Sequence, residues 1–217
     1  MRAVRTALVF LALLALVGTS AAVAARGDPQ KRITPADQAR AKSMLLRPAD
    51  FNAAYTALPT SGGSRGDFYC AALDESDLTL TGEAQSPNFT TTGEYVASTA
   101  SVYRSRSDAT TSWKRGTSAV GQECLRAGVR AELRSSATRL VSFGRIAFPR
   151  RGDRSVAYRA TASQQGIRIY VDVVAIRVSR SQAAVIYISA LAPPPSGELR
   201  RLTALVANRA AAAMRGS

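Results

Sequence analysis

Residues 153–191 constrain the fold of this chain more than any other stretch. They contain three runs rich in β-branched, aromatic and small residues, at 155–163, 167–178 and 183–191. The turns between the runs are so short that neighbouring runs can pair only as antiparallel strands. The middle run is apolar along one face and becomes apolar along the other in its second half. It therefore predicts a central strand with helices on one or both sides.

The other segments predict an α+β domain. Further strands are expected at 78–80, 94–104 and 138–146, giving a mainly antiparallel sheet of about five to six strands. An N-terminal helix is expected to begin at the cap Thr34 with Pro35 in its first turn, and a second, short helix over 48–58. A central helix is expected after the cap Ser107, with Trp113 as a core anchor, and a C-terminal helix after the cap Ser196. Polar loops are expected at 59–67 and 84–93. The interpretation is one domain at 34–217, after a flexible lead at 26–33.

The first 25 residues predict an export segment. Arg2 and Arg5 precede an apolar run at 7–17, and the small residues at 18–25 include an Ala-Val-Ala cleavage pattern at 22–24. This is typical of a secretory signal peptide. The alternative is an uncleaved N-terminal anchor, because residues 6–25 carry no charge. Both interpretations place the domain outside the cytoplasm, secreted or in the cell envelope.

The charge of the chain favours anionic partners. The net charge is +14, and 26 of the 29 basic residues are arginine. Two arginines lie in the export segment, so the mature chain keeps +12 (14 − 2). Arginine forks match carboxylate and phosphate oxygens in pairs. Outside the cell the expected partners are an anionic lipid, a wall polymer or an acidic envelope protein, whereas export argues against nucleic acid. The alternative interpretation is a set of scattered, solvated surface arginines.

Cys70 and Cys124 are the only cysteines, and in an exported chain they predict a disulfide. The chain contains no histidine, which excludes a Ser-His-Asp triad, histidine-ligated zinc and a histidine-activated thiol. No catalytic residue, cofactor or metal is therefore expected, and no residue can be assigned to ligand binding.

Four weaker patterns have a functional and a structural interpretation. Residues 62–66 match the serine-hydrolase elbow but lie in a predicted loop without a base. The acidic run 74–77 suits a hard cation or, more simply, a solvated turn. Arg-Gly-Asp occurs at 26–28, 65–67 and 151–153, where it suits an adhesion receptor or an ordinary turn. Asp153 and Asp172 are candidate carboxylates for a glycan hydrolase, provided that they face each other across a cleft.

The order of these features resembles that of the secreted actinobacterial PknH-type extracellular sensor domains and the related Mog1/PsbP-like lipoproteins. The matching marks are the Leu-Leu-Arg-Pro-Ala-Asp run at 45–50, Tyr69-Cys70, the strand at 94–104, Trp113 before Cys124, the turn at 152–155 and the last helix. The resemblance implies a curved antiparallel sheet packed by helices, with a cleft for an extracellular ligand. This chain departs from the group in lacking a kinase domain and a lipid-anchor cysteine, and in having one cysteine pair where the kinase sensor has two.

The leading hypothesis is an exported, non-enzymatic, sensor-like domain that binds an anionic or amphiphilic ligand of the cell envelope. One alternative is a carboxylate-dependent extracellular hydrolase. The other is an adhesion or interaction protein that displays the Arg-Gly-Asp loops.

Overall fold

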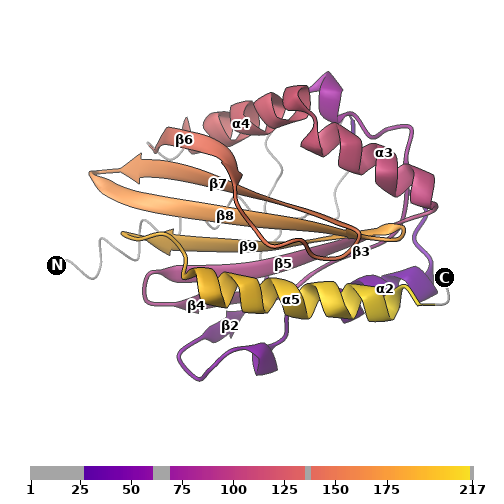
Figure 1. Ribbon diagram of the computed structural model, residues 1–217, viewed down its shortest axis with the longest axis horizontal. Coiled ribbons are helices and arrows are strands. Elements are labelled where there is room, and N and C mark those ends of the chain that lie inside the picture. The colour runs from indigo at the N-terminus through magenta and orange to yellow at the C-terminus, as the bar shows by residue number, and fades with distance from the viewer. Residues whose placement is uncertain (1–26, 61–68, 135–137, 216–217) are drawn as a thin grey trace.

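The computed structural model describes residues 27–60, 69–134 and 138–215, which form an open sheet with helices packed on it (Figure 1). In these residues the sheet has nine strands in the order β1-β3-β5-β9-β8-β7-β6, while β4 pairs with β5, and β2 with β4. The strands are β1 Gln30–Lys31, β2 Thr56–Leu58, β3 Thr79–Gln85, β4 Asn88–Thr91, β5 Glu94–Tyr103, β6 Arg139–Ile146, β7 Arg154–Gln164, β8 Ile167–Val178 and β9 Ser181–Ala190. Only the pair β1–β3 is parallel among them. The predicted α+β class is confirmed; β1, β2 and β4 are the strands that were not expected.

The helices cover both faces of the sheet. They are α2 Pro35–Met44, α3 Arg106–Thr117, α4 Ala119–Arg134 and α5 Ser196–Ala213, with 3-10 turns η2 at Pro48–Asp50 and η3 at Ala71–Leu73. Figure 1 shows α2 and α5 on one side of the sheet and α3 and α4 on the other. We call these sides the α5 face and the α3 face.

The strand triplet has the predicted antiparallel arrangement. β8 is hydrogen-bonded to β7 on one side and to β9 on the other. Two residues join each pair, Gln165-Gly166 and Ser179-Arg180, and Gln165 and Gly166 have φ values of 49° and 82°. Positive φ at both positions gives the turn a twist that matches the strands it joins.

The main core lies on the α5 face. Val174 and Val185 have exposures of 0%, and Leu202 and Val206 of α5 are likewise fully buried in the same cluster. Burial of each such side chain contributes about 1.5–3 kcal/mol, so this layer dominates the stability of the fold. The α3 face carries two smaller clusters among the described residues, one under α4 around Tyr95 and one beside α3 that includes Ala109.

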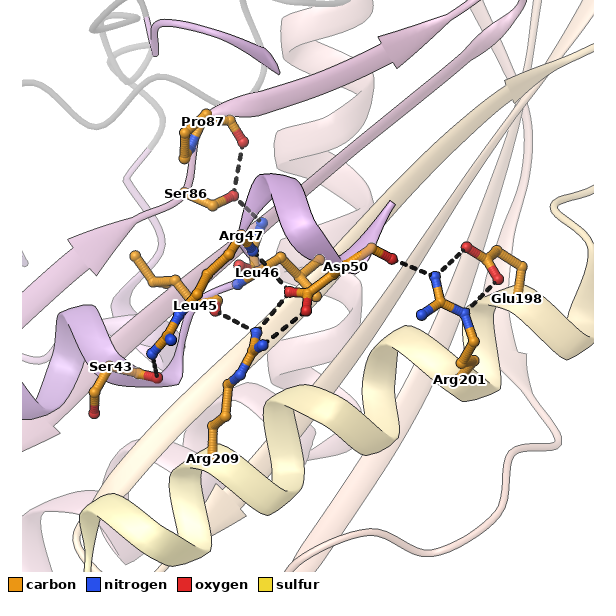
Figure 2. A network of polar contacts seen from close by, with 11 residues as sticks. Ser43, Leu45, Leu46, Arg47, Asp50, Ser86, Pro87, Glu198, Arg201 and Arg209 are labelled. Carbon is orange, nitrogen blue, oxygen red and sulfur yellow. Dashed lines mark hydrogen bonds and ion pairs between the residues drawn. The ribbon is translucent and has the colours of Figure 1, made fainter. Parts of the chain in front are cut away.

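A network of ion pairs fastens α5 to the segment after α2 (Figure 2). Arg209 donates to both carboxylate oxygens of Asp50 at 2.6 and 2.7 Å, and to the Leu45 carbonyl at 2.8 Å. The Arg47 amide also donates to Asp50, at 2.7 Å. Burial raises the pKa of Asp50, but the hydrogen bonds from Arg209 and Arg47 outweigh it and hold the pKa below its ordinary value. The motif at 45–50 is therefore a structural clamp.

Two local predictions were wrong because pairing across the chain decided the conformation. The segment 48–58 forms η2 and then β2, because residues 56–58 pair with β4. The predicted loop at 84–93 contains β4 for the same reason. Strand pairing with a distant segment outweighs the weak local preference of both stretches.

Helix starts were predicted more accurately at α2 than at the later helices. Thr34 caps α2 as expected, by accepting the Asp37 amide at 3.2 Å. The cap of α3 is Ser105, not Ser107, and Pro195 occupies the cap position of α5, with Ser196 as the first helical residue. Several polar residues near each of these starts can serve as the cap, so sequence alone leaves an uncertainty of two residues.

Candidate functional site

Part of the α3 face is left incompletely covered, unlike the α5 face behind it. Strand alternation places one side chain of β8 or β9 on each face in turn. Val174 and Val185, which face α5, are fully buried, whereas their neighbours on the α3 face are only half-buried. We call this half-exposed apolar area the floor; it consists of Val156, Val173, Ala175, Ala184 and Ile186.

The floor residues form two rows across adjacent strands. Ala175 lies between Val156 of β7 and Ala184 of β9, and Val173 lies opposite Ile186. Because directly opposite side chains share a face and stand about 5 Å apart, the rows form one continuous apolar area. This partly exposed apolar area is a candidate surface for a ligand or a partner.

Polar side chains join α3 to the sheet around the floor. Arg177 donates from Nη1 to Thr110 Oγ1 at 2.6 Å, and Gln182 donates from Nε2 to the Ala109 carbonyl at 3.0 Å. At the other end of the helix the Arg145 guanidinium donates to the carbonyl of Thr117. Thr110 and Thr117 are separated by about 10 Å at 1.5 Å per residue. These hydrogen bonds, which we call tethers, therefore hold α3 near the sheet over about 10 Å, and no apolar interface of the same length accompanies them.

Trp113 lies on the helix face that these tethers define. It follows Thr110 by three residues and precedes Thr117 by four, so the three share one face of α3. Trp113 is half-buried and belongs to none of the buried core clusters in the described part of the chain. The prediction that Trp113 is a core anchor was wrong, because α3 enters a buried cluster through Ala109 and its other links to the sheet are polar.

Two buried polar atoms beside the floor have no hydrogen-bond partner among the residues that the structure describes. They are the Tyr158 hydroxyl and Arg177 Nε. Tyr158 is 7% exposed; its ring is stacked with Phe143 at 5.7 Å, and the Arg145 guanidinium lies 5.8 Å from the ring centroid. A buried polar group without a partner costs about 1–3 kcal/mol, so both atoms are suited to receive a polar ligand group.

The arginines of this protein divide into two groups. Arg180, Arg209 and Arg159 bind buried carboxylates through two nitrogens each, and these arginines stabilise the fold. The arginines around the floor are different. Within residues 27–60, 69–134 and 138–215, neither Arg145 nor Arg177 forms an ion pair with a carboxylate. No carboxylate of the described residues is ion-paired with either of them.

The candidate carboxylates of a hydrolase do not face each other. Asp172 is fully buried on the α5 face, where Arg159 binds it at 2.6 Å through each of two nitrogens. Asp153 accepts a hydrogen bond from the Ser179 amide at 2.8 Å, and its own amide bonds to the Arg177 carbonyl. Arg177 lies five residues from Asp172 along β8, which corresponds to about 16 Å at 3.3 Å per residue. This exceeds the spacing of catalytic carboxylate pairs, which is at most about 10 Å, and rejects this pair.

The acidic run at 74–77 is occupied by contacts within the protein. Asp74 accepts hydrogen bonds from the Tyr69 hydroxyl at 2.8 Å and the Ser76 amide at 2.9 Å, and Arg115 binds both oxygens of Asp77 at 2.6 and 2.8 Å. No group of three or more His, Cys, Asp or Glu residues in the described part of the chain is arranged to hold a metal ion. The run is a surface turn with internal partners.

The tripeptide and elbow patterns gain no functional support. Residues 62–66, residues 65–67 and Arg26 lie outside the described residues. In the tripeptide at 151–153 the carboxylate is engaged with Ser179, and Gly152 has φ 57°. A side chain at Gly152 would also come within 2.7 Å of the Arg177 carbonyl. Glycine is required there by the turn itself.

The predicted disulfide is confirmed: Cys70 and Cys124 are bonded, with their Cα atoms 6.0 Å apart. The bond joins η3 to α4 and is consistent with an extracellular protein. A surface pocket of about 360 Å³ lies beside it, lined by Tyr69, Cys70, Val120, Cys124, Ala127 and Arg130 among others. Among the described residues no helix has the length and apolar character needed to cross a membrane. Residues 1–26 lie outside the described part, so the export segment stays a prediction.

Sequence reasoning missed the floor. The alternation in β8 indicated two apolar faces, and helices were expected on one or both of them. The local sequence does not distinguish a strand face that a helix buries from one that a helix passes over without burying it. No protein-family model matches this chain, and no curated protein is significantly similar to it, so the sensor-domain resemblance stays a hypothesis.

Proposed function

We propose that this protein is an exported, non-enzymatic binding domain, of a sensor-like kind, for an anionic amphiphile of the cell envelope. The ligand would lie between α3 and the floor. The observation that carries the proposal is the combination of a half-exposed apolar floor with arginines at its ends that have no carboxylate partner.

Burial of the floor supplies the affinity for an apolar chain. Each methylene group that leaves water contributes about 0.8 kcal/mol, part of which is lost again in ordering the ligand. The floor lies under a helix held by hydrogen bonds, and such contacts can be exchanged for contacts with a ligand at small net cost. Arg145 and Arg177 lie at its ends, where they favour a ligand with a negative group over one with a positive group.

A binding role is preferred to catalysis on chemical grounds. The chain lacks histidine, and the two carboxylates with the best sequence case for hydrolysis are far apart. Export agrees with the disulfide and with the apolar segment at 7–17.

The test uses two detergents with the same chain and opposite charge, dodecyl phosphate and dodecyltrimethylammonium, below their micelle concentrations and at low salt. Trp113 is the only tryptophan in the protein, so its fluorescence reports directly on the site. Titration of the mature chain with dodecyl phosphate should shift the emission of Trp113 with a micromolar Kd. The cationic detergent should bind at least ten-fold more weakly.

Matched variants locate the binding. Val173→Gln places a polar group in the floor and should weaken dodecyl phosphate binding at least ten-fold. Val141→Gln makes the same change on β6 at a side chain that is 44% exposed, and should leave binding unchanged. Equal binding of the two detergents, or equal affinity in the two variants, would refute the proposal.

A further inference from the structure

We propose that Arg106, Arg154 and Arg177 form a subsite for a phosphoryl group at one end of the floor. The inference deepens the proposed function. The direction in which the ligand's apolar chain runs depends on that proposed function. The binding of phosphate itself stands on the geometry of the three arginines.

Strand register brings two of these arginines together. Arg154 of β7 lies directly opposite Arg177 of β8, on the same face of the sheet. Directly opposite side chains have their Cβ atoms about 5 Å apart, and like charges in such a pair destabilise the sheet. The register therefore places two positive charges side by side, and their repulsion is present in the empty protein.

The third arginine comes from α3. Arg106 Nε donates to Ser179 Oγ at 3.2 Å, two residues after Arg177. Arg177 in turn donates to Thr110, one helical turn after Arg106. Both side chains thus cross the junction between α3 and the end of β8, and strand register places Arg154 beside this junction.

The carboxylates near this cluster are hydrogen-bonded to other groups. Among the described residues none of the three arginines forms an ion pair. The carboxylate of Asp153 is nearby, but it accepts the Ser179 amide, and that of Asp108 accepts the Ser105 hydroxyl at 2.7 Å and the Thr79 amide at 3.3 Å. Arg177 Nε is buried and has no hydrogen-bond partner in the described structure. This orphan donor is an independent sign that an acceptor belongs there.

The number of donors indicates the chemical class of the ligand. Each guanidinium can give two parallel hydrogen bonds, and a phosphoryl group has at least three oxygens to receive such pairs from several directions. A carboxylate has two oxygens, and a single arginine, Arg159, binds both oxygens of Asp172 elsewhere in this protein. Arg177 lies two residues from Ala175 and four from Val173 on the same strand face, so a chain attached to the phosphate would run along the floor.

Thermal unfolding of the mature chain in sodium phosphate, compared with sodium chloride at equal ionic strength, tests the subsite. The chloride arm removes the effect of simple charge screening. At ten times Kd, phosphate should raise Tm by about 3–6 °C above the chloride value. Arg154→Gln should remove this rise, and its own Tm without phosphate should be equal to or above that of the wild type, because the like-charge pair is gone.

Arg168→Gln is the matched control, because Arg168 is an exposed arginine at the other end of β8. It should keep the full response to phosphate. An equal rise of Tm in Arg154→Gln and the wild type, or an equal rise in chloride, would overturn the subsite.

The Trp113 titration separates this inference from the proposed function and identifies the source of the phosphate. Undiminished binding of dodecyl phosphate to Arg154→Gln would overturn the subsite and leave the amphiphile site standing. Dodecyl phosphate bound at least ten-fold more tightly than inorganic phosphate, with both weakened in Arg154→Gln, would support a phosphate ester of a lipid. Equal affinities, both weakened, would support free phosphate at the same three arginines.

Discussion

Arg180 connects the turn between β8 and β9 to the start of α2, and its replacement by methionine should destabilise the protein strongly. Its guanidinium binds both oxygens of Asp37 at 2.8 Å and donates to the Tyr103 carbonyl at 2.9 Å. The side chains of Asp37 and Arg180 are 8% and 16% exposed. Water can therefore replace few of the hydrogen bonds that the Asp37 carboxylate loses in the variant.

The expected magnitude follows from the contacts that remain. Removing one member of a buried ion pair costs about 3–5 kcal/mol, because the other charge stays buried. Asp37 keeps its hydrogen bond from Arg40 at 2.7 Å, which places the loss at the lower end of that range. For a domain of this size a loss of about 3 kcal/mol lowers Tm by about 6–12 °C.

Urea and thermal unfolding at pH 7 measure the loss, with Arg40→Met as the matched control. Arg40 touches the same carboxylate, but its side chain is 33% exposed, so its loss should cost about 1 kcal/mol or less. If Arg180→Met costs no more than Arg40→Met, then the buried pair does not stabilise the protein and the reasoning is wrong.

The pH dependence gives a second measurement. The hydrogen bonds from Arg180, more than any other contact, hold the pKa of Asp37 well below its usual value. A group with a lowered folded-state pKa stabilises the protein above its unfolded-state pKa, about 3.9 for aspartate, and less as the pH falls below that value. The difference between the wild type and Arg180→Met should thus be full at pH 7 and shrink from about pH 4 downward. A difference that stays constant from pH 7 to pH 2.5 would contradict the assignment.

Three further predictions concern the framework. Reduction of the Cys70–Cys124 disulfide should lower the free energy of unfolding by about 4 kcal/mol on the chain-entropy estimate for its 54-residue separation, measured by urea unfolding with and without reductant. Gly82→Ala should destabilise the protein by more than about 2 kcal/mol, because the new Cβ would lie 2.3 Å from the Asp37 carbonyl oxygen of α2. The control is Gly144→Ala on β6, where a Cβ would have no atom within 4 Å. In the same assay its stability should stay within about 0.5 kcal/mol of the wild type. Arg209→Met should cost about 3 kcal/mol by leaving the buried carboxylate of η2 without its cation, and equal stability of variant and wild type would refute the clamp.

The strand triplet was predictable because its determinants are local. Turns of a few residues with Gly166 and Ser179 leave antiparallel pairing as the only geometry, and alternation then assigns each side chain to a face. The pairing of β2 with β4 was not predictable in this way, because Thr56 meets Thr90 only when the intervening chain has folded. The conformation of η2 was not predictable for the same reason. Pro48 and Asp50 suit the start of a helix, but in the folded protein Asp50 binds Arg209 of α5.

The sequence by itself determined the α+β class, the disulfide and the lack of any histidine-based chemistry, since these follow from local turn geometry, the count of two cysteines and composition. Tertiary structure decided which arginines are bound to carboxylates and which are left with their charge. It set Arg154 against Arg177 through strand register, and it left Val173 half-exposed by holding α3 with polar tethers. Register and helix docking are set by contacts between residues far apart in the chain, and the exposure of a side chain depends on them more than on its neighbours in sequence.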